Sequence, residues 1–243
     1  MQFFSISDKG MLRKNNEDSA FAKEIGKFTL LILADGMGGH SGGEVASKMA
    51  IEEISSFLED KLTEKMLPGQ IMLLISEALE SANEKIFALS KSDIDLIGMG
   101  TTCDVCLVLE STAYIAHIGD SRVYKISASG EIKKLTRDHS LIEFMLENGT
   151  ITPDEAINHP QKNIILRAIG ISDAIEPDIF HEKISPCDVI LLCSDGLTNM
   201  LDESTIKETV LFEAEPRKIA EKLVKLANDA GGADNITVVI FKY

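Results

Sequence analysis

Residues 28–43 constrain the fold of this chain most, because they join an apolar run to a glycine-rich segment. Residues 28–34 read FTLLILA, a nearly continuous apolar run that is typical of a buried strand. Asp35 follows this run directly and opens the segment DGMGGHSGG. Glycines permit sharp turns and close approach of the backbone. The sequence therefore presents a carboxylate at a corner suited to a hard cation or a phosphate.

Two kinds of binding site compete for this corner, a nucleotide site and a metal site. A dinucleotide-binding loop needs a third glycine where Ser41 stands, and no Gly-Lys-Ser/Thr follows at P-loop spacing. A metal site would use the carboxylate of Asp35 and the carbonyl of Gly36. A glycine cluster taken alone is also compatible with a plain strand-to-helix turn. The positions of the other acidic residues are needed to choose among a nucleotide site, a metal site and a plain turn.

Composition narrows the classes of partner. The 243 residues include 39 acidic and 24 basic side chains, for a formal net charge of −15. This balance argues against binding to nucleic acid or to an anionic membrane, and any phosphate site must be made positive locally by metal ions. No apolar run has the length of a membrane span, and the N-terminus lacks the features of a signal peptide. We therefore expect a cytoplasmic protein.

Apolar periodicity predicts the main elements. Helices are expected over residues 44–62, 68–89 and 216–227, the last two opened by proline. Strands are expected over residues 1–8, 28–34, 101–109, 111–118, 122–126, 188–193 and 236–240. Short turns between neighbouring strands favour an antiparallel sheet, whereas a dinucleotide-binding fold alternates strands with crossover helices. Two short helices expected within residues 138–170 indicate an excursion from the core.

Cys103 and Cys106 are spaced like half of a redox or zinc site, but no second pair accompanies them. They lie in the expected strand 101–109, where residues three apart point to opposite faces. We interpret both as small, reduced core residues.

Five aspartates share one pattern, a carboxylate beside glycine or asparagine at the edge of an apolar strand. They are Asp18, Asp35, Asp120, Asp195 and Asp234. One such residue would be read as a turn residue, but five in one domain can converge on one site. Converging carboxylates repel one another unless cations bridge them. Oxygen ligands select magnesium or manganese over zinc, and two such ions can activate a water and clamp a phosphoryl group.

With these residues the chain resembles the metal-dependent serine/threonine protein phosphatases of the type 2C family, in their compact bacterial form. The matching stretches follow the family's order over nearly the whole chain, at residues 7–10, 13–18, 34–43, 98–102, 117–122, 194–197 and 234–237. The resemblance implies an α+β fold with a central sandwich of two antiparallel β-sheets flanked by pairs of helices, a four-layer α/β/β/α arrangement. It also implies a single catalytic domain over residues 1–243, with a flap subdomain at about 138–170.

The resemblance assigns the metal ligands. It implies that Asp35 bridges two core ions, Mn²⁺ or Mg²⁺, and that the carbonyl of Gly36 binds one of them. Asp195 and Asp234 would complete the site of the other ion. A third ion, as in bacterial members, would be held by Asp120 together with Asp195.

Further roles follow from the same resemblance. Asp18, with Glu17, would hold metal-bound waters, and Arg13 would bind the substrate phosphate, for which its planar guanidinium is suited. Many eukaryotic members have a histidine where Met37 stands, proposed to protonate the leaving oxygen. A thioether cannot donate a proton, so His40 or a metal-bound water is expected to serve here.

The remaining histidines receive no catalytic role. His139 and His159 flank the excursion, where a structural role is favoured over contact with substrate. His117 falls in an expected strand, and His181 is expected near a polar turn.

The expected function is hydrolysis of phosphoserine and phosphothreonine in proteins by direct attack of a metal-activated water. No phosphoenzyme is expected, because no cysteine or histidine nucleophile is arranged for one. The implied partners are a bacterial serine/threonine kinase and its substrates, and a monomer is expected. Three alternatives are a catalytically silent binding module on the same fold, a phosphatase dedicated to one regulatory protein, and a nucleotide-binding α/β protein.

Overall fold

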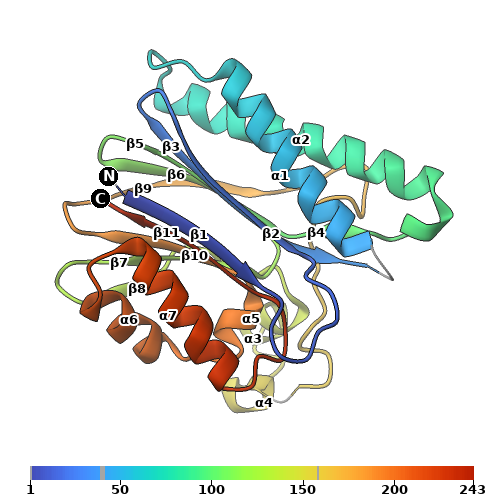
Figure 1. Cartoon of the computed structure of the whole chain (residues 1–243). Coiled ribbons are helices and arrows are strands. Elements are labelled where there is room, and N and C mark those ends of the chain that lie inside the picture. The colour runs from blue at the N-terminus through green and yellow to red at the C-terminus, as the bar shows by residue number, and fades with distance from the viewer. Residues whose placement is uncertain (1, 39–41, 158) are drawn as a thin grey trace.

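The computed structural model describes residues 2–38, 42–157 and 159–243. Two β-sheets pack face to face, and long helices cover both outer faces, as Figure 1 shows. The four-layer α/β/β/α architecture predicted from the sequence is confirmed.

The first sheet has the strand order β1-β11-β10-β7-β8. Its strands are β1 (Gln2–Asp8), β11 (Ile236–Lys242), β10 (Val189–Cys193), β7 (Arg122–Ile126) and β8 (Ile132–Lys134). The β1–β11 register places Gln2 opposite Lys242 at one end of the sheet and Asp8 opposite Ile236 at the other. The two chain termini therefore lie side by side at one end of the sandwich (Figure 1).

The second sheet has the strand order β2-β3-β5-β6-β9, and β4 pairs with the end of β3. Its strands are β2 (Asp18–Ile25), β3 (Phe28–Met37), β4 (Gly100–Thr101), β5 (Cys103–Leu109), β6 (Thr112–Ile118) and β9 (Asp178–Lys183). The pairings within both sheets are antiparallel. This finding removes the nucleotide-binding alternative, which requires a parallel sheet.

The helices cover the two outer faces in pairs. α1 (Gly42–Lys61) and α2 (Pro68–Ser92) lie on the second sheet, and α6 (Glu203–Phe212) and α7 (Pro216–Asp229) lie on the first (Figure 1). A short turn, η1 (Ile94–Leu96), follows α2, and the short α5 (Asp195–Thr198) follows β10. The helices expected after Pro68 and Pro216 are confirmed, and each proline occupies the first turn.

Three apolar cores hold the layers together, one between each helix pair and its sheet and one between the sheets. Cys103 packs in the core under α1 and α2, whereas Cys106 packs between the two sheets. The prediction that these cysteines face opposite sides of one strand is therefore confirmed, and both are buried and free.

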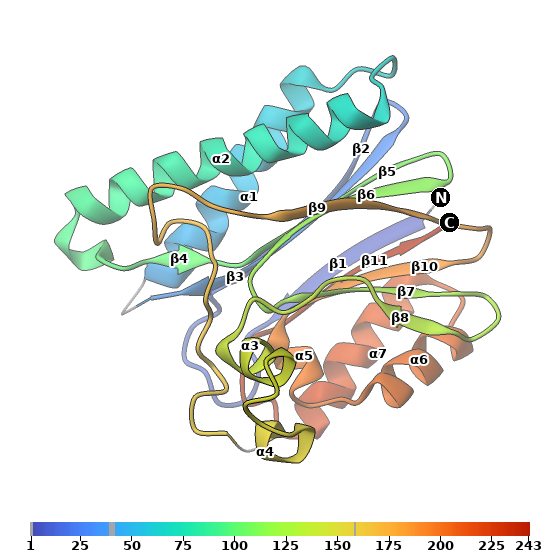
Figure 2. The same cartoon turned by 180° about the vertical axis from the view of Figure 1, so that it is seen from behind.

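The connection from β8 to β9, residues 135–177, is the predicted excursion from the core. It contains α3 (Leu141–Glu147) and α4 (Pro153–Ile157), which lie beside α5 at one end of the sandwich (Figure 2). Neither helix contains a buried residue. We call this segment the α3–α4 connection.

One expectation about a histidine is wrong. His181 does not lie near a polar turn but within β9, opposite Tyr114 of β6. β9 is an edge strand whose side chains are half-buried or exposed, so its hydrophobic signal is weak and pairing with β6 decides its conformation. Among the described helices, none combines the length and the apolar character that a membrane span requires.

Candidate active site

Asp18 and Asp35 face each other across two strands. Asp18 begins β2, Asp35 lies near the end of β3, and the antiparallel register pairs them directly. Residues so paired have Cβ atoms about 5 Å apart, and like charges at that spacing are destabilising. Asp18 is 7% exposed, and neither of its carboxylate oxygens accepts a hydrogen bond from a described residue. Among the described residues, the carboxylate of Asp18 therefore has no positive partner.

The other three aspartates lie at strand ends that reach the same place. Asp120 lies in the turn between β6 and β7, Asp195 opens α5 directly after β10, and Asp234 precedes β11. Asp120 and Asp195 line one cavity. Asn199 Nδ2 donates to Asp195 Oδ2 at 3.0 Å. The site thus lies between the sheets, at the end of the sandwich away from the chain termini.

The electrostatics confirm that these carboxylates are neighbours. Burial, together with the charge of Asp195, raises the pKa of Asp18 to about 6. Burial, followed by the charges of Asp18, Asp195, Asp120 and Asp234, raises the pKa of Asp35 well above its ordinary value. Burial and then the charge of Asp195 raise the pKa of Asp120 to about 7. Protons or cations must therefore neutralise part of this cluster.

Arg13 lies beside Asp234 at the rim of the site. Its Nη2 donates to Asp234 Oδ2 at 2.7 Å, and the two side chains are 52% and 30% exposed. The charges of Glu17 and Asp195 also favour the guanidinium. Arg13 thus partly compensates the negative charge of the acidic cluster from the rim of the site.

Within the described part of the chain, no three His, Cys, Asp or Glu side chains form a group already arranged around one ion.

Two of the site aspartates, Asp35 and Asp195, are followed by a glycine that close backbone approach requires. A Cβ on Gly36 would lie 2.1 Å from the carbonyl oxygen of Gly43 and 2.5 Å from that of Glu17. A Cβ on Gly196 would lie 1.9 Å from the carbonyl oxygen of Asn235. Any side chain at either position would force the segments that carry the site residues apart.

Asn235 is a site residue that the sequence reasoning did not single out. Its Oδ1 accepts the backbone N–H of Glu17 at 2.8 Å, and its Nδ2 donates to the carbonyl oxygens of Lys9 and Asn15, both at 2.9 Å. The side chain is buried. Asn235 therefore fastens the loop that carries Arg13 to the start of β11. An asparagine between an aspartate and an apolar strand was the only sequence signal for this role.

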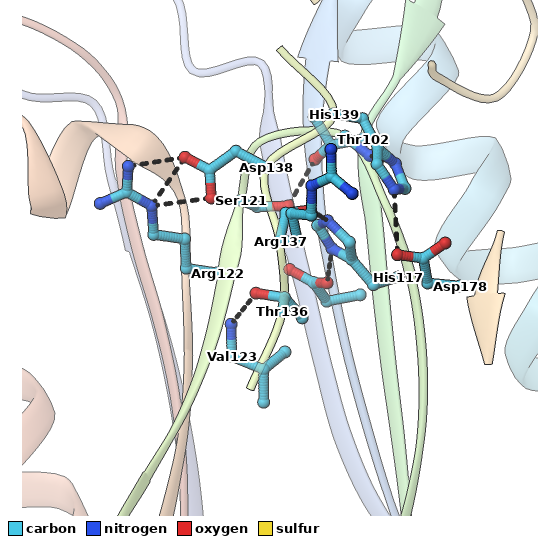
Figure 3. Close-up of polar contacts among 12 residues, drawn as sticks. Thr102, His117, Ser121, Arg122, Val123, Thr136, Arg137, Asp138, His139 and Asp178 are labelled. Carbon is cyan, nitrogen blue, oxygen red and sulfur yellow. Dashed lines mark hydrogen bonds and ion pairs between the residues drawn. The ribbon is translucent and has the colours of Figure 1, made fainter. Parts of the chain in front are cut away.

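Thr102 is a second residue of this kind. Its Oγ1 accepts the backbone N–H of Asp35 at 3.0 Å and the hydroxyl of Ser121 at 3.0 Å, the latter drawn in Figure 3. The N–H of Thr102 donates to the carbonyl of Asp35 at 2.9 Å. Thr102 and Ser121 are both buried. The turn that contains Asp120 and the end of β3 are therefore joined through one hydroxyl.

Arg122 and Asp138 connect β7 to the start of the α3–α4 connection. Arg122 Nε donates to both carboxylate oxygens of Asp138, at 3.1 and 3.0 Å, and its Nη2 donates to Oδ2 at 2.6 Å (Figure 3). Burial acts to raise the pKa of Asp138, but the hydrogen bonds and charge of Arg122 hold it below its ordinary value. Such forked, charge-assisted pairs are the strong ones, so this one anchors the connection.

The histidines near the site have structural contacts. His117 is fully buried, with Nδ1 at 2.6 Å from Asp104 Oδ1. The centre of its ring lies 4.7 Å from that of His139, and the two rings are tilted by 41° (Figure 3). His139 Nδ1 accepts the N–H of Gly119 at 3.2 Å. His159, in the α3–α4 connection, accepts the N–H of Gln161. His40, the expected proton donor, lies outside the described residues.

The chain is similar in sequence and in structure to known protein phosphatases. The family model for protein phosphatase 2C matches residues 13–227. Protein phosphatase PhpP of Streptococcus pneumoniae is 40% identical over 242 residues, 99% of this chain and 96% of that protein. The structure of the S. agalactiae serine/threonine phosphatase superposes with a TM-score of 0.92 at 36% identity, covering 98% of both chains. The catalytic domain of serine/threonine protein phosphatase PstP, in complex with 2 manganese ions, has a TM-score of 0.84 at 36% identity, covering 98% of this chain and 96% of that one.

Proposed function

The chain belongs to the protein phosphatase 2C family, and we propose that it removes phosphate from phosphoserine and phosphothreonine in proteins by metal-dependent hydrolysis. The observation that carries the proposal is the buried Asp18 carboxylate, without a hydrogen-bond partner among the described residues and opposite Asp35. A folded protein tolerates such an arrangement when cations neutralise it. The assignment of the named relatives as serine/threonine phosphatases supports the choice of substrate.

The donor set fits magnesium or manganese, because every candidate ligand is an oxygen. Bound there, the ions would neutralise the carboxylates and phosphate and make a water nucleophilic at neutral pH. In this proposal Asp35 would serve both core ions, the carbonyl of Gly36 would hold one of them, and Asp195 and Asp234 would hold the other. The two manganese ions of the PstP neighbour support a pair of ions.

Asp120 would add a third ion site together with Asp195. The two residues line the same cavity, and the charge of Asp195 helps to raise the pKa of Asp120. Asp18 and Glu17 would act through water, consistent with the absence of direct partners for the Asp18 oxygens in the described chain.

Arg13 is the proposed phosphate-binding residue. A guanidinium has five N–H donors in a planar fork, so a single bond to Asp234 leaves donors for phosphate oxygens. Its half-exposed side chain is accessible to substrate. His40 is the proposed donor of the leaving-group proton, because the thioether of Met37 cannot donate one.

The proposal extends to the biological setting. The chain acts as a single catalytic domain with the α3–α4 connection as its flap, as a monomer in the cytoplasm, and a serine/threonine kinase of the same cell supplies its substrates. Sedimentation of the purified protein tests the monomer directly. A dimer that persists at nanomolar concentration would contradict it.

The decisive experiment is hydrolysis of a phosphothreonine peptide with and without manganese, by the wild type and by Asp195→Ala. Manganese-dependent turnover that the substitution abolishes is expected, together with weaker manganese binding in calorimetry. Asp60→Ala, the same change on the exposed face of α1, serves as the control and should behave as wild type. Folded wild-type protein without turnover in any divalent metal would instead favour the catalytically silent binding module.

A further inference from the structure

The turn between β6 and β7, residues 119–121, carries Asp120 and is held at both ends. At its far end, the hydroxyl of Ser121 donates to Thr102 Oγ1 at 3.0 Å. At its near end, Gly119 has a φ of +121°, and a Cβ there would lie 2.5 Å from the side chain of Thr102. A shift of this turn, and of Asp120 with it, would therefore disturb contacts on both sides.

His139 holds the near end of the turn through both backbone groups of Gly119. Its N–H donates to the carbonyl of Gly119 at 2.6 Å, and its Nδ1 accepts the N–H of Gly119 at 3.2 Å. Both residues are buried, so the N–H of Gly119 has no ready access to water. A buried N–H without an acceptor is costly. Loss of the imidazole would therefore favour movement of the turn that carries Asp120.

The second ring nitrogen of His139 sets the orientation of the imidazole. Nε2 lies 3.3 Å from Asp178 Oδ2 of β9, the contact that a dashed line marks in Figure 3. Because Nδ1 accepts a hydrogen bond, the proton of the neutral ring is on Nε2, which donates it to this carboxylate. Arg167 Nη1 pairs with the other oxygen of Asp178 at 3.5 Å. Asp178 therefore fixes the tautomer that Gly119 requires.

His117 supports the ring of His139 from one side. The centres of the two rings lie 4.7 Å apart. His117 Nδ1 lies 2.6 Å from Asp104 Oδ1, and its Nε2 lies 2.9 Å from the carbonyl oxygen of Arg137. Both partners accept hydrogen bonds, which an imidazolium satisfies. Burial, followed by the charge of His117, lowers the pKa of His139, which leaves its Nδ1 free to accept.

We propose that His139 is a positioning residue of the candidate third ion site, where it holds Asp120 in the place from which that carboxylate would bind manganese together with Asp195. The inference rests on the proposed function, which includes this ion site. His139 lines a different cavity from the one that Asp120 and Asp195 share, so it acts through the backbone of Gly119. Loss of a group that orients a metal ligand typically weakens metal binding about 10–100-fold.

Two partial replacements of the imidazole test this inference. Asparagine has Oδ1 two bonds from Cβ, as histidine has Nδ1, so it retains the acceptor for Gly119. Glutamine has its amide three bonds from Cβ, as histidine has Nε2, so it retains only the contact with Asp178. In hydrolysis of p-nitrophenyl phosphate, His139→Asn should reach half-maximal rate within about threefold of the manganese that the wild type needs. His139→Gln and His139→Ala should need about tenfold more, and at saturating manganese the rates should converge.

Two further measurements do not depend on activity. Calorimetry should show weaker binding at the weakest manganese site of His139→Gln and His139→Ala, with the tighter sites unchanged. In metal-free protein, the amide hydrogen of Gly119 should exchange faster in these two variants than in the wild type and His139→Asn. The melting temperature should fall in all three variants, because each loses the packing of the imidazole on His117. A purely structural role therefore predicts no advantage of asparagine over glutamine.

Two variants outside His139 complete the design. His181→Asn, the same change at an exposed position of β9, is the matched control and should behave as wild type. Asp178→Ala tests the inference even where substitution of His139 unfolds the protein. Its side chain is 45% exposed, so its loss leaves the core intact. It releases Nε2 and should raise the manganese requirement by a smaller factor, about threefold.

The outcomes separate this inference from the proposed function. Manganese-dependent hydrolysis by the wild type, with equal manganese requirements in His139→Asn and His139→Ala, would overturn the inference alone. Slow exchange of the Gly119 amide in His139→Ala, or an unchanged manganese requirement in Asp178→Ala, would overturn it as well. Folded wild-type protein without turnover in any divalent metal would overturn the proposed function itself.

Discussion

The sandwich and the α3–α4 connection place side chains by opposite means. In the sandwich, pairing of the edge strand β2 with the buried strand β3 holds Asp18 opposite Asp35, and buried hydroxyl and amide groups fasten the neighbouring turns. In the connection, α3 and α4 bury no residue, and the pair of Arg122 with Asp138 anchors its start.

This difference indicates that the sandwich holds the catalytic groups in place and that the connection does not. Chemistry at a phosphate requires groups held in fixed geometry, and tightly packed strands supply that. The α3–α4 connection has no buried helix residues to hold such a geometry. Substitutions in the sandwich should therefore affect activity and stability more than substitutions in α3 and α4.

The largest expected effect is loss of activity at the centre of the cluster. Asp35→Asn retains the shape of the side chain but removes its charge, so kcat should fall about 10³-fold or more, as expected for a group that acts at the reacting atoms. In metal-free buffer the same protein should unfold at a higher temperature than wild type, because one buried carboxylate is removed. Asp60→Asn in α1 is the control, and loss of both activity and stability in Asp35→Asn would contradict the comparison.

The second effect is a dependence of stability on pH in metal-free protein. Asp18 and Asp195 have pKa values of about 6, and Asp120 about 7, all above the ordinary value of 3.8. The folded state thus holds more protons than the unfolded state between about pH 4 and 7, and the unfolding free energy falls as pH rises through that window. For Asp18 alone the fall is on the order of 3 kcal/mol.

Thermal unfolding in EDTA from pH 4.5 to pH 7.5 measures this dependence. Manganese should flatten the curve above pH 6, because it favours the charged carboxylates, and Asp18→Asn should reduce the slope without metal. A melting temperature that rises with pH in EDTA would contradict the electrostatic description of the site.

Thr102→Val should have an intermediate effect. It removes the acceptor for the buried N–H of Asp35, which costs about 1–3 kcal/mol of stability. It should also lower kcat, because the main chain of Asp35 loses a hydrogen bond. Thr136→Val is the matched control, since Thr136 Oγ1 accepts the buried N–H of Val123 at 3.0 Å (Figure 3). The two variants should lose similar stability, and only Thr102→Val should lose activity.

The smallest effect is expected in the connection. Phe144→Ala should change the unfolding free energy by less than about 0.5 kcal/mol, because its side chain is 53% exposed. Ile142→Ala and Leu146→Ala should each cost about 1 kcal/mol, because these side chains are half-buried. Denaturant titration measures this change. A loss of 2 kcal/mol or more in any of them would show that α3 packs like a sandwich helix and would remove the contrast between the two regions.

Much of the site could be predicted from the sequence. Asp35 and Asp195 each follow an apolar run and precede a glycine, and the glycine is needed locally because the backbone passes within contact of a neighbour. α1, α2 and α7 were predicted because their apolar residues repeat with the helical period and proline opens two of them. The edge strands β2 and β9 were not predicted, because half-buried strands have a weak hydrophobic pattern.

The sequence by itself determined which chemical groups are present and at which strand ends they lie, because buried strands, glycine turns and helical stripes are properties of a few adjacent residues. Only the tertiary structure decided which of these groups meet. The pairing of Asp18 with Asp35, the bond from Asn235 to the loop before β2 and the cavity shared by Asp120 and Asp195 depend on strand register and on contacts between distant segments. Such contacts form only once both sheets have packed, and no local pattern encodes them.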